Sequence, residues 1–240
     1  MNKFTNKLTI VLVILLSAYI LTIIFPQPLF KYHIEYKNFK VYSNQKLDNN
    51  IYNILDNVNN KLKISKIYTD KIHYRLFICN NYTKYTYFAN INHNSLGITL
   101  PLIDHIFIPN TDIKNNLTIS NINSKRSLDS IIAHEATHKL LENKYGFIKS
   151  RFMTTWKEEG YCDYIAHTST FNIQEGIKIF KNNQDNNSNE YKYFIYRLRM
   201  TYLLNVKKEN LDNILNTKYD LNILDNEIKD NLDKINLINN

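Results

Sequence analysis

The segment His134-Glu135-Ala136-Thr137-His138 constrains the fold of this 240-residue chain more than any other feature. On an α-helix, residues four positions apart lie on one face, about 6 Å apart along the helix axis. Two histidines at this spacing can bind one metal ion, and Glu135 is placed to hold a metal-bound water and to take its proton. The segment therefore predicts a helix that carries two metal ligands and a general base.

Apolar residues at helical spacing flank this segment, Ser127 and Asp129 are candidate caps, and the helix is expected to end near Gly146. The apolar neighbours are Leu128, Ile131, Ile132, Leu140 and Leu141. Such flanks predict a buried helix. Buried imidazoles need polar partners, and a single metal ion would bind both of them. The alternative, a surface helix with ordinary histidines, does not explain the flanks.

A third protein ligand is predicted in residues 156–164, because a catalytic zinc takes three protein ligands and keeps its fourth position for water. Glu159 lies 21 positions beyond His138, enough for one helix to end and another to begin. Asp163, one turn beyond Glu159, is expected to accept a hydrogen bond from a ligand imidazole. Glu158 is the competing third ligand, and a solvated helix start is the alternative reading of the two glutamates.

Together these residues resemble the gluzincin zinc metallopeptidases, in particular the bacterial group called peptidase MA-like. The motifs cover about residues 127–167, with a looser likeness in element order over residues 32–206. The resemblance implies a zincin-like fold, bound Zn²⁺ and a peptide or protein substrate. It also implies zinc ligands at His134, His138 and Glu159, a general base at Glu135, and a supporting group at Asp163.

Two residues depart from the family pattern without removing a ligand. Lys139 stands where an uncharged residue is usual, and we expect it to face solvent. Cys162 stands where alanine is common, as a small buried substitution. Cys79 and Cys162 have no metal-binding spacing, so ordinary buried thiols are expected, with a disulfide as the alternative.

Other roles depend on the resemblance alone. A gluzincin edge strand commonly holds the substrate in an extended conformation, and residues 96–100 or His105–Ile108 would do so here, unless both only build the sheet. Tyr193 and Tyr196 are candidates to stabilise the oxyanion, against the alternative that they are core residues.

Three of the five histidines outside the metal motif could bear on the site. We expect His93 and His105 to be ordinary surface histidines rather than substrate contacts. His167 lies eight positions beyond Glu159 on the same helical face, so a role behind a metal ligand is open to it.

The N-terminus carries an uncharged, mostly apolar stretch of 18 residues, positions 8–25. As a helix it would be about 27 Å long, close to the roughly 30 Å of a bilayer core. Lys3 and Lys7 precede it without an acidic residue, which favours a cytoplasmic N-terminus. We expect residues 1–25 to be a retained signal anchor and the rest to be extracytoplasmic. A cleaved signal peptide is the alternative, although residues 19–24 offer a poor cleavage site.

Composition and element order define the class of fold. The net charge of +8 is scattered rather than collected in a stripe, so nucleic acid is not an expected partner. Strand patterns precede helical ones, which predicts one α+β domain over residues 26–240, with a small mixed sheet over the metal helix and further helices C-terminal. Strands are expected at residues 32–42, 73–79, 96–100 and His105–Ile108, a helix at 47–62, a short helix or loop at 85–89, and a polar loop at 110–125.

These features predict a membrane-anchored zinc-dependent metallopeptidase. The alternative from another class is a membrane-anchored protein that keeps zinc for structure, binding or assembly without catalysis. A zinc hydrolase acting on another amide would differ only in its substrate.

Overall fold

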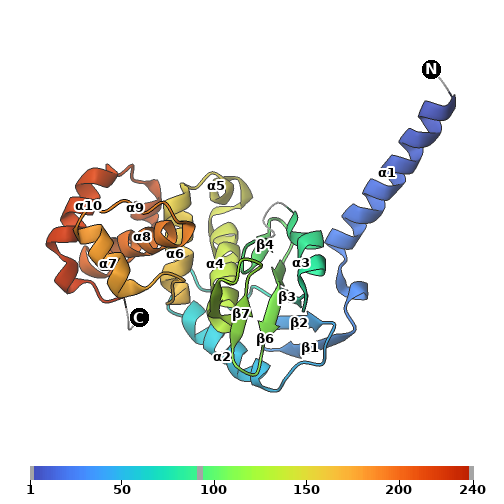
Figure 1. Ribbon diagram of the computed structural model, residues 1–240, viewed down its shortest axis with the longest axis horizontal. Helices are drawn as coiled ribbons and strands as arrows, with labels where there is room; N and C mark the ends of the chain where they lie inside the picture. Colours follow the sequence, from blue (N-terminus) through green and yellow to red (C-terminus); the bar gives the residue numbers. More distant parts are fainter. Residues whose placement is uncertain (1–2, 91–93, 238–240) are drawn as a thin grey trace.

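The computed structural model describes residues 3–90 and 94–237. In these residues every strand lies before residue 128 and the elements that follow are helices, as predicted. The architecture is mixed α+β. A sheet lies at one end of the body, the later helices gather at the other, and α4 (Leu128–Tyr145) lies between them (Figure 1). Helix α1 (Lys3–Ile24) projects from the body on the side of the sheet.

In the described part of the chain, five strands form a mixed sheet in the order β1-β2-β3-β5-β4. The strands are β1 (Tyr32–Tyr36), β2 (Phe39–Ser43), β3 (Tyr74–Ile78), β4 (Ile98–Leu100) and β5 (His105–Ile108). β2, β3 and β5 run parallel, and β1 and β4 pair antiparallel at the two edges. The single strand predicted over residues 32–42 is instead a hairpin, which turns at Lys37 with a positive φ of 51°.

Alternate residues of the central strand face two different cores, as a sheet covered on both faces requires. Leu76 and Ile78 belong to the large core that contains α2 (Asn50–Leu62) and α4. Phe77 packs on the opposite face with α3 (Tyr82–Ala89). The predicted amphipathic helix is therefore confirmed as α2, and the segment left as a short helix or loop is α3.

Residues 110–125, predicted as a polar loop, instead contain most of a second antiparallel sheet among the described residues. Its strands are β6 (Asn110–Asp112), β7 (Leu117–Ile119) and β8 (Lys125–Ser127). The prediction was wrong because three-residue strands of largely polar sequence are too short to show an alternating pattern. β8 continues directly into α4, so this small sheet fixes where the motif helix begins.

Helix α4 is almost wholly buried as far as Leu141 and ends at Gly146, as predicted. Helix α6 (Thr155–Ala166) packs against α4 and crosses α8 (Asn189–Thr201). At that crossing, a Cβ on Gly160 would lie 2.5 Å from the carbonyl oxygen of Tyr196, so only glycine fits.

The other helical segments of the described residues are the 3₁₀ turns Gln27–Leu29 and Leu232–Lys234, α5 (Phe147–Arg151), α7 (Ile173–Lys181), the π-helical Tyr202–Val206, α9 (Leu211–Asn216) and α10 (Leu221–Asp230).

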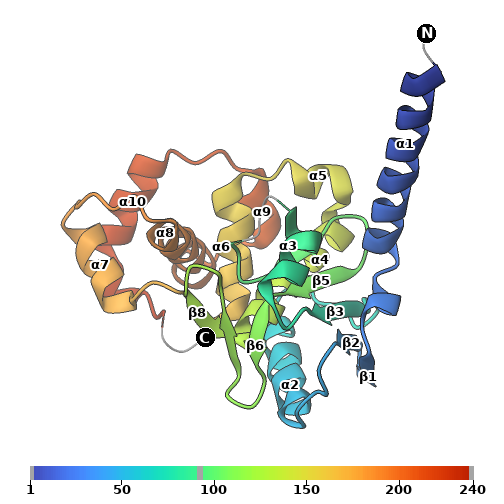
Figure 2. The same ribbon diagram turned by 45° about the vertical axis from the view of Figure 1, so that its right-hand side comes forward.

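Helix α1 is long and apolar enough to cross a membrane, because its segment Lys7–Ile24 has a mean hydropathy of 2.5 and none of it is buried. A signal sequence has the same length and composition. Both views show α1 standing clear of the body (Figures 1 and 2). Near its C-terminal end, the Tyr19 hydroxyl donates to the carbonyl of Tyr87 at 3.1 Å.

Candidate metal centre

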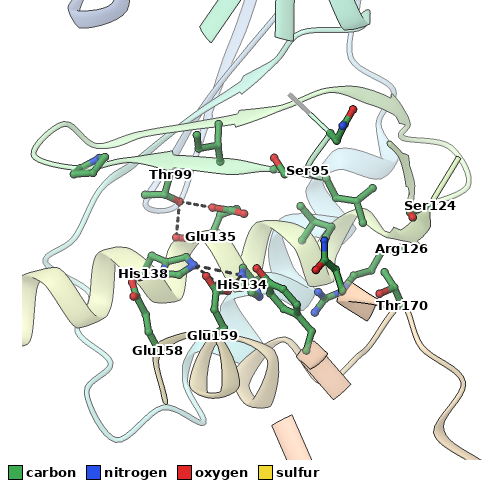
Figure 3. A pocket seen from close by; sticks show the side chains of 18 of the residues that line it. Ser95, Thr99, Ser124, Arg126, His134, Glu135, His138, Glu158, Glu159 and Thr170 are labelled. Carbon is green, nitrogen blue, oxygen red and sulfur yellow. Dashed lines mark hydrogen bonds and ion pairs between the residues drawn. The ribbon is translucent and has the colours of Figure 1, made fainter. Parts of the chain in front are cut away.

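Helix α4 brings the two motif histidines together, as predicted. The Nε2 atoms of His134 and His138 lie 3.3 Å apart at the edge of a pocket (Figure 3). The other nitrogen of each ring meets a carboxylate of α6: Nδ1 of His134 lies 2.8 Å from Asp163, and Nδ1 of His138 lies 3.0 Å from Glu158. Because ionised carboxylates only accept hydrogen bonds, each Nδ1 carries a hydrogen. In the neutral rings, both Nε2 lone pairs therefore point into the shared space.

Asp163 accepts a hydrogen bond from one of the two motif imidazoles, as predicted, whereas Glu158 has a position that sequence analysis missed. Glu158 was considered only as a competing third ligand, yet its carboxylate accepts from His138. The sequence does not show which of the two adjacent glutamates meets Nδ1 of His138, because that depends on how α6 is rotated about its axis against α4.

Glu159 is the carboxylate that completes the set of donors. Its Oε2 lies 3.2 Å from Nε2 of His134 and 3.8 Å from Nε2 of His138. Donors about 2.0–2.1 Å from a tetrahedral zinc lie roughly 3.3 Å from one another, so these spacings fit one ion. With both rings neutral, this Oε2 is also buried without a hydrogen-bond donor among the described residues, as expected of a ligand atom. The residues present therefore fit zinc.

Cys162 forms a second grouping with the same histidines. Its thiol and the two imidazoles have ligand atoms that all lie within 4.8 Å of one another, which makes the three residues a candidate metal-binding cluster. Burial raises the pKa of this thiol well above its ordinary value. The Glu159 oxygen lies 3.2 and 3.8 Å from the two Nε2 atoms, near the spacing of tetrahedral donors, so the carboxylate and the thiol are alternative third donors beside the two imidazoles. Both cysteines are free and buried, in agreement with the prediction.

Without metal, the buried site holds protons. Burial alone would lower the pKa of both histidines, but the surrounding carboxylates raise it, to about 10 for His134. Burial alone would raise the pKa of Asp163, but Arg126 and His134 lower it to about 2. The pKa of Glu159 is likewise lowered, against the effect of burial, by the two imidazoles. A metal ion must therefore displace protons from the histidines.

Arg126, which sequence analysis did not single out, supports the site from β8. Its guanidinium lies 2.8 Å from Oδ1 of Asp163, the oxygen that also meets His134. Its Nε and Nη2 donate to Thr168, at 2.9 Å to the hydroxyl and 2.8 Å to the carbonyl. The guanidinium is thus held by Thr168 on one side and by Asp163 on the other. It therefore fixes the carboxylate that orients the imidazole of His134.

Glu135 is held from the opposite side, by the edge strand β4. Its Oε2 accepts a hydrogen bond from the Thr99 hydroxyl at 2.7 Å. A Cβ on Gly97 would lie 3.0 Å from Cγ and Oε1 of Glu135, so the chain approaches the carboxylate closely at a residue without a side chain. The predicted base is therefore oriented by the residues just before and within β4.

The donors and Glu135 line one cleft of about 650 Å³, with β4 on one side and α4 on the other (Figure 3). Of the two strands considered for holding a substrate, β4 lines this cleft and is an edge strand of its sheet in the described part of the chain. β5 pairs on both sides and cannot add a strand. Tyr193 lines the cleft, whereas Tyr196 belongs to the residues packed on the core.

Two predictions on single residues were wrong. His105 is buried rather than on the surface, and burial lowers its pKa to about 4. Lys139 is also buried, and it pairs with two carboxylates at 3.2 and 3.1 Å instead of facing solvent. His167 ends α6, and the Nδ1 atoms that it might have supported are already bonded to carboxylates. His93 lies outside the described residues.

Comparison with known proteins gives no relative to set beside this geometry: no protein-family model matches the chain, and no curated protein matches it. The site itself therefore carries the functional argument.

Proposed function

We propose that this chain is a zinc-dependent metallopeptidase of the gluzincin type, held in the cytoplasmic membrane by α1 with its peptidase domain outside. One observation carries the proposal. Two imidazole nitrogens and one carboxylate oxygen, from α4 and α6, lie 3.2, 3.3 and 3.8 Å from one another and border the cleft that contains Glu135. Three donors with an open side are typical of catalytic rather than structural zinc.

His134, His138 and Glu159 would hold the metal. Bound zinc would lower the pKa of a water molecule towards about 7 and polarise a substrate carbonyl. Glu135 would take a proton from that water and deliver it to the leaving amine. Its hydrogen bond to Thr99, 2.7 Å long, orients the carboxylate before substrate binds. The edge of β4 would bind the peptide in an extended conformation.

Tyr193 is the candidate to donate a hydrogen bond to the developing oxyanion. It lines the cleft, and burial raises the pKa of its hydroxyl, which therefore keeps its proton. Tyr196 is not needed for this role.

The test compares the purified full chain with Glu135→Gln on a panel of unstructured polypeptides, with and without a chelator. The wild type should cleave and the chelator should stop it. Glu135→Gln should lose about 10²–10⁴-fold in rate, the usual contribution of a general base, while elemental analysis still finds one zinc per chain. Turnover that survives the substitution would exclude the assigned base.

Cys162 favours a second candidate, a non-catalytic zinc site. If its thiolate bound the ion together with the two histidines and Glu159, four protein ligands would close the site, as in structural zinc centres. Cys162→Ala separates the two candidates. A catalytic site keeps its zinc and its turnover in this variant, whereas a closed structural site loses the metal.

A further inference from the structure

Helix α5 and its surroundings leave large apolar side chains uncovered. Ile148 is 72 % exposed and Phe152 is 83 % exposed, although both lie within one short segment. Leu102, in the turn between β4 and β5, is 68 % exposed. We call residues 147–152 with Leu102 the α5 patch. Singly exposed apolar residues are ordinary on protein surfaces, but a group this exposed marks an interaction surface.

The chain segment that carries α5 is basic, whereas the carboxylates beside Leu102, Asp104 and Glu142, are paired with Lys139. Residues 143–153 contain three basic residues and no Asp or Glu. Lys149 and Arg151 are exposed and alternate with the apolar side chains of α5. Apolar side chains interleaved with cations are the composition that binds the surface of an anionic bilayer.

The patch lies on the face of the body towards which α1 rises. Both views show α5 along the upper edge of the body, near α4, and α1 rising upward from the sheet end (Figures 1 and 2). The β4–β5 turn lies between α1 and the end of α4: Nδ1 of His105, at the start of β5, lies 3.2 Å from the carbonyl of Ile23, and the backbone N–H of Leu102 donates to Glu142, near the end of α4, at 3.3 Å. Leu102 has a φ of +65°, a conformation that leucine rarely adopts, and its side chain faces solvent in this turn.

We propose that the α5 patch docks on the surface of the same bilayer that α1 crosses. Ile148 and Phe152 would insert among the lipid headgroups, and Lys149 and Arg151 would bind lipid phosphates. The inference rests on α1 being a membrane anchor and is independent of peptidase activity. Anchor and patch together fix how the body is rotated on the membrane. Because Phe147 and Arg151 also line the cleft, that end of the cleft then lies at the bilayer surface.

Fluorescence quenching by lipid tests this proposal on the full chain. Ile148→Cys and Phe152→Cys each carry a thiol-reactive environment-sensitive dye. Cys79 and Cys162 are fully buried, and burial raises both thiol pKa values, to about 12 for Cys79, so the introduced cysteine is the one labelled. The chain is reconstituted in vesicles of phosphatidylcholine and phosphatidylglycerol that contain headgroup spin-labelled lipid. Both labels should lose about half of their fluorescence, as expected for side chains roughly 5–10 Å into the interface.

The matched control is Ile223→Cys, which labels an equally apolar, 60 % exposed position on α10 at the other end of the body. Its label should not be quenched. Adding Lys149→Glu to Ile148→Cys should weaken quenching at position 148, as should raising the salt concentration. If the labels at positions 148 and 152 are quenched no more strongly than the label at position 223, the proposal is overturned. The α5 patch would then bind a protein partner instead of the bilayer. Adding Glu135→Gln should leave quenching unchanged, so the result does not depend on the peptidase function.

Discussion

Arg126 and His134 contact the same oxygen atom: the guanidinium and the imidazole each lie 2.8 Å from Oδ1 of Asp163. Arg126 comes from β8, outside both helices that carry the proposed ligands. The orientation of one ligand imidazole is therefore set by the small sheet that precedes α4. Groups that orient a metal-binding histidine typically change metal affinity when they are altered.

Replacing Arg126 with lysine should weaken zinc binding by about 10- to 100-fold while the chain still folds, because lysine keeps the charge but loses the fork that also holds Thr168. Affinity is measured by competition with a chelating dye. Arg199→Lys is the matched control, since Arg199 pairs with Asp225 between α8 and α10. Equal zinc affinity in the Arg126 variant and the wild type would contradict the positioning role.

Glu158→Gln separates a supporting role from a ligand role. We expect this variant to keep one zinc per chain with affinity lowered by about 10-fold or more, because an amide oxygen still accepts from His138 but carries no charge. Glu159→Gln should lose stoichiometric zinc. Elemental analysis after dialysis distinguishes the two variants. The reverse outcome would make Glu158 the third ligand.

Zinc binding should release protons and strengthen as pH rises. The folded pKa of His134, about 10, is raised above its ordinary 6.5. Its proton therefore stabilises the metal-free fold fully below pH 6.5, and this contribution is lost as pH rises towards about 10. At neutral pH, zinc must displace protons, roughly one to two per ion. Calorimetric titration in two buffers with different ionisation enthalpies measures that number. Heats that do not depend on the buffer would show that the imidazoles are already neutral.

Sequence reasoning succeeded where one helix fixes the geometry. The spacing of His134 and His138, and of Glu159 and Asp163, sets a common face whatever the rest of the chain does. It failed where the answer depends on how separate elements pack. Neither the guanidinium of Arg126 behind Asp163 nor the burial of Lys139 has a local signal, because both depend on sheet contacts distant in sequence. Strands such as β6 were missed for a different reason: three polar residues are too few to show an alternating pattern.

Two glycines near the site should respond differently to alanine, because they meet different kinds of atom. At Gly160, the added Cβ would lie 2.5 Å from the backbone oxygen of Tyr196, which cannot move without shifting α8 against α6. Gly160→Ala should therefore lower the free energy of unfolding by about 1–3 kcal/mol or more, and weaken zinc binding with it.

At Gly97, the added Cβ would lie 3.0 Å from the side chains of Glu135 and Ile131, which can give way by a rotation. Gly97→Ala should leave the thermal midpoint and the zinc content close to wild type and slow peptide cleavage, because the carboxylate is pushed from the position that Thr99 gives it. Thermal unfolding, elemental analysis and kcat on one peptide make the comparison. If Gly97→Ala cleaves as fast as wild type while Gly160→Ala is destabilised, the close approach of the chain at Gly97 does not orient the base, and its glycine serves packing alone.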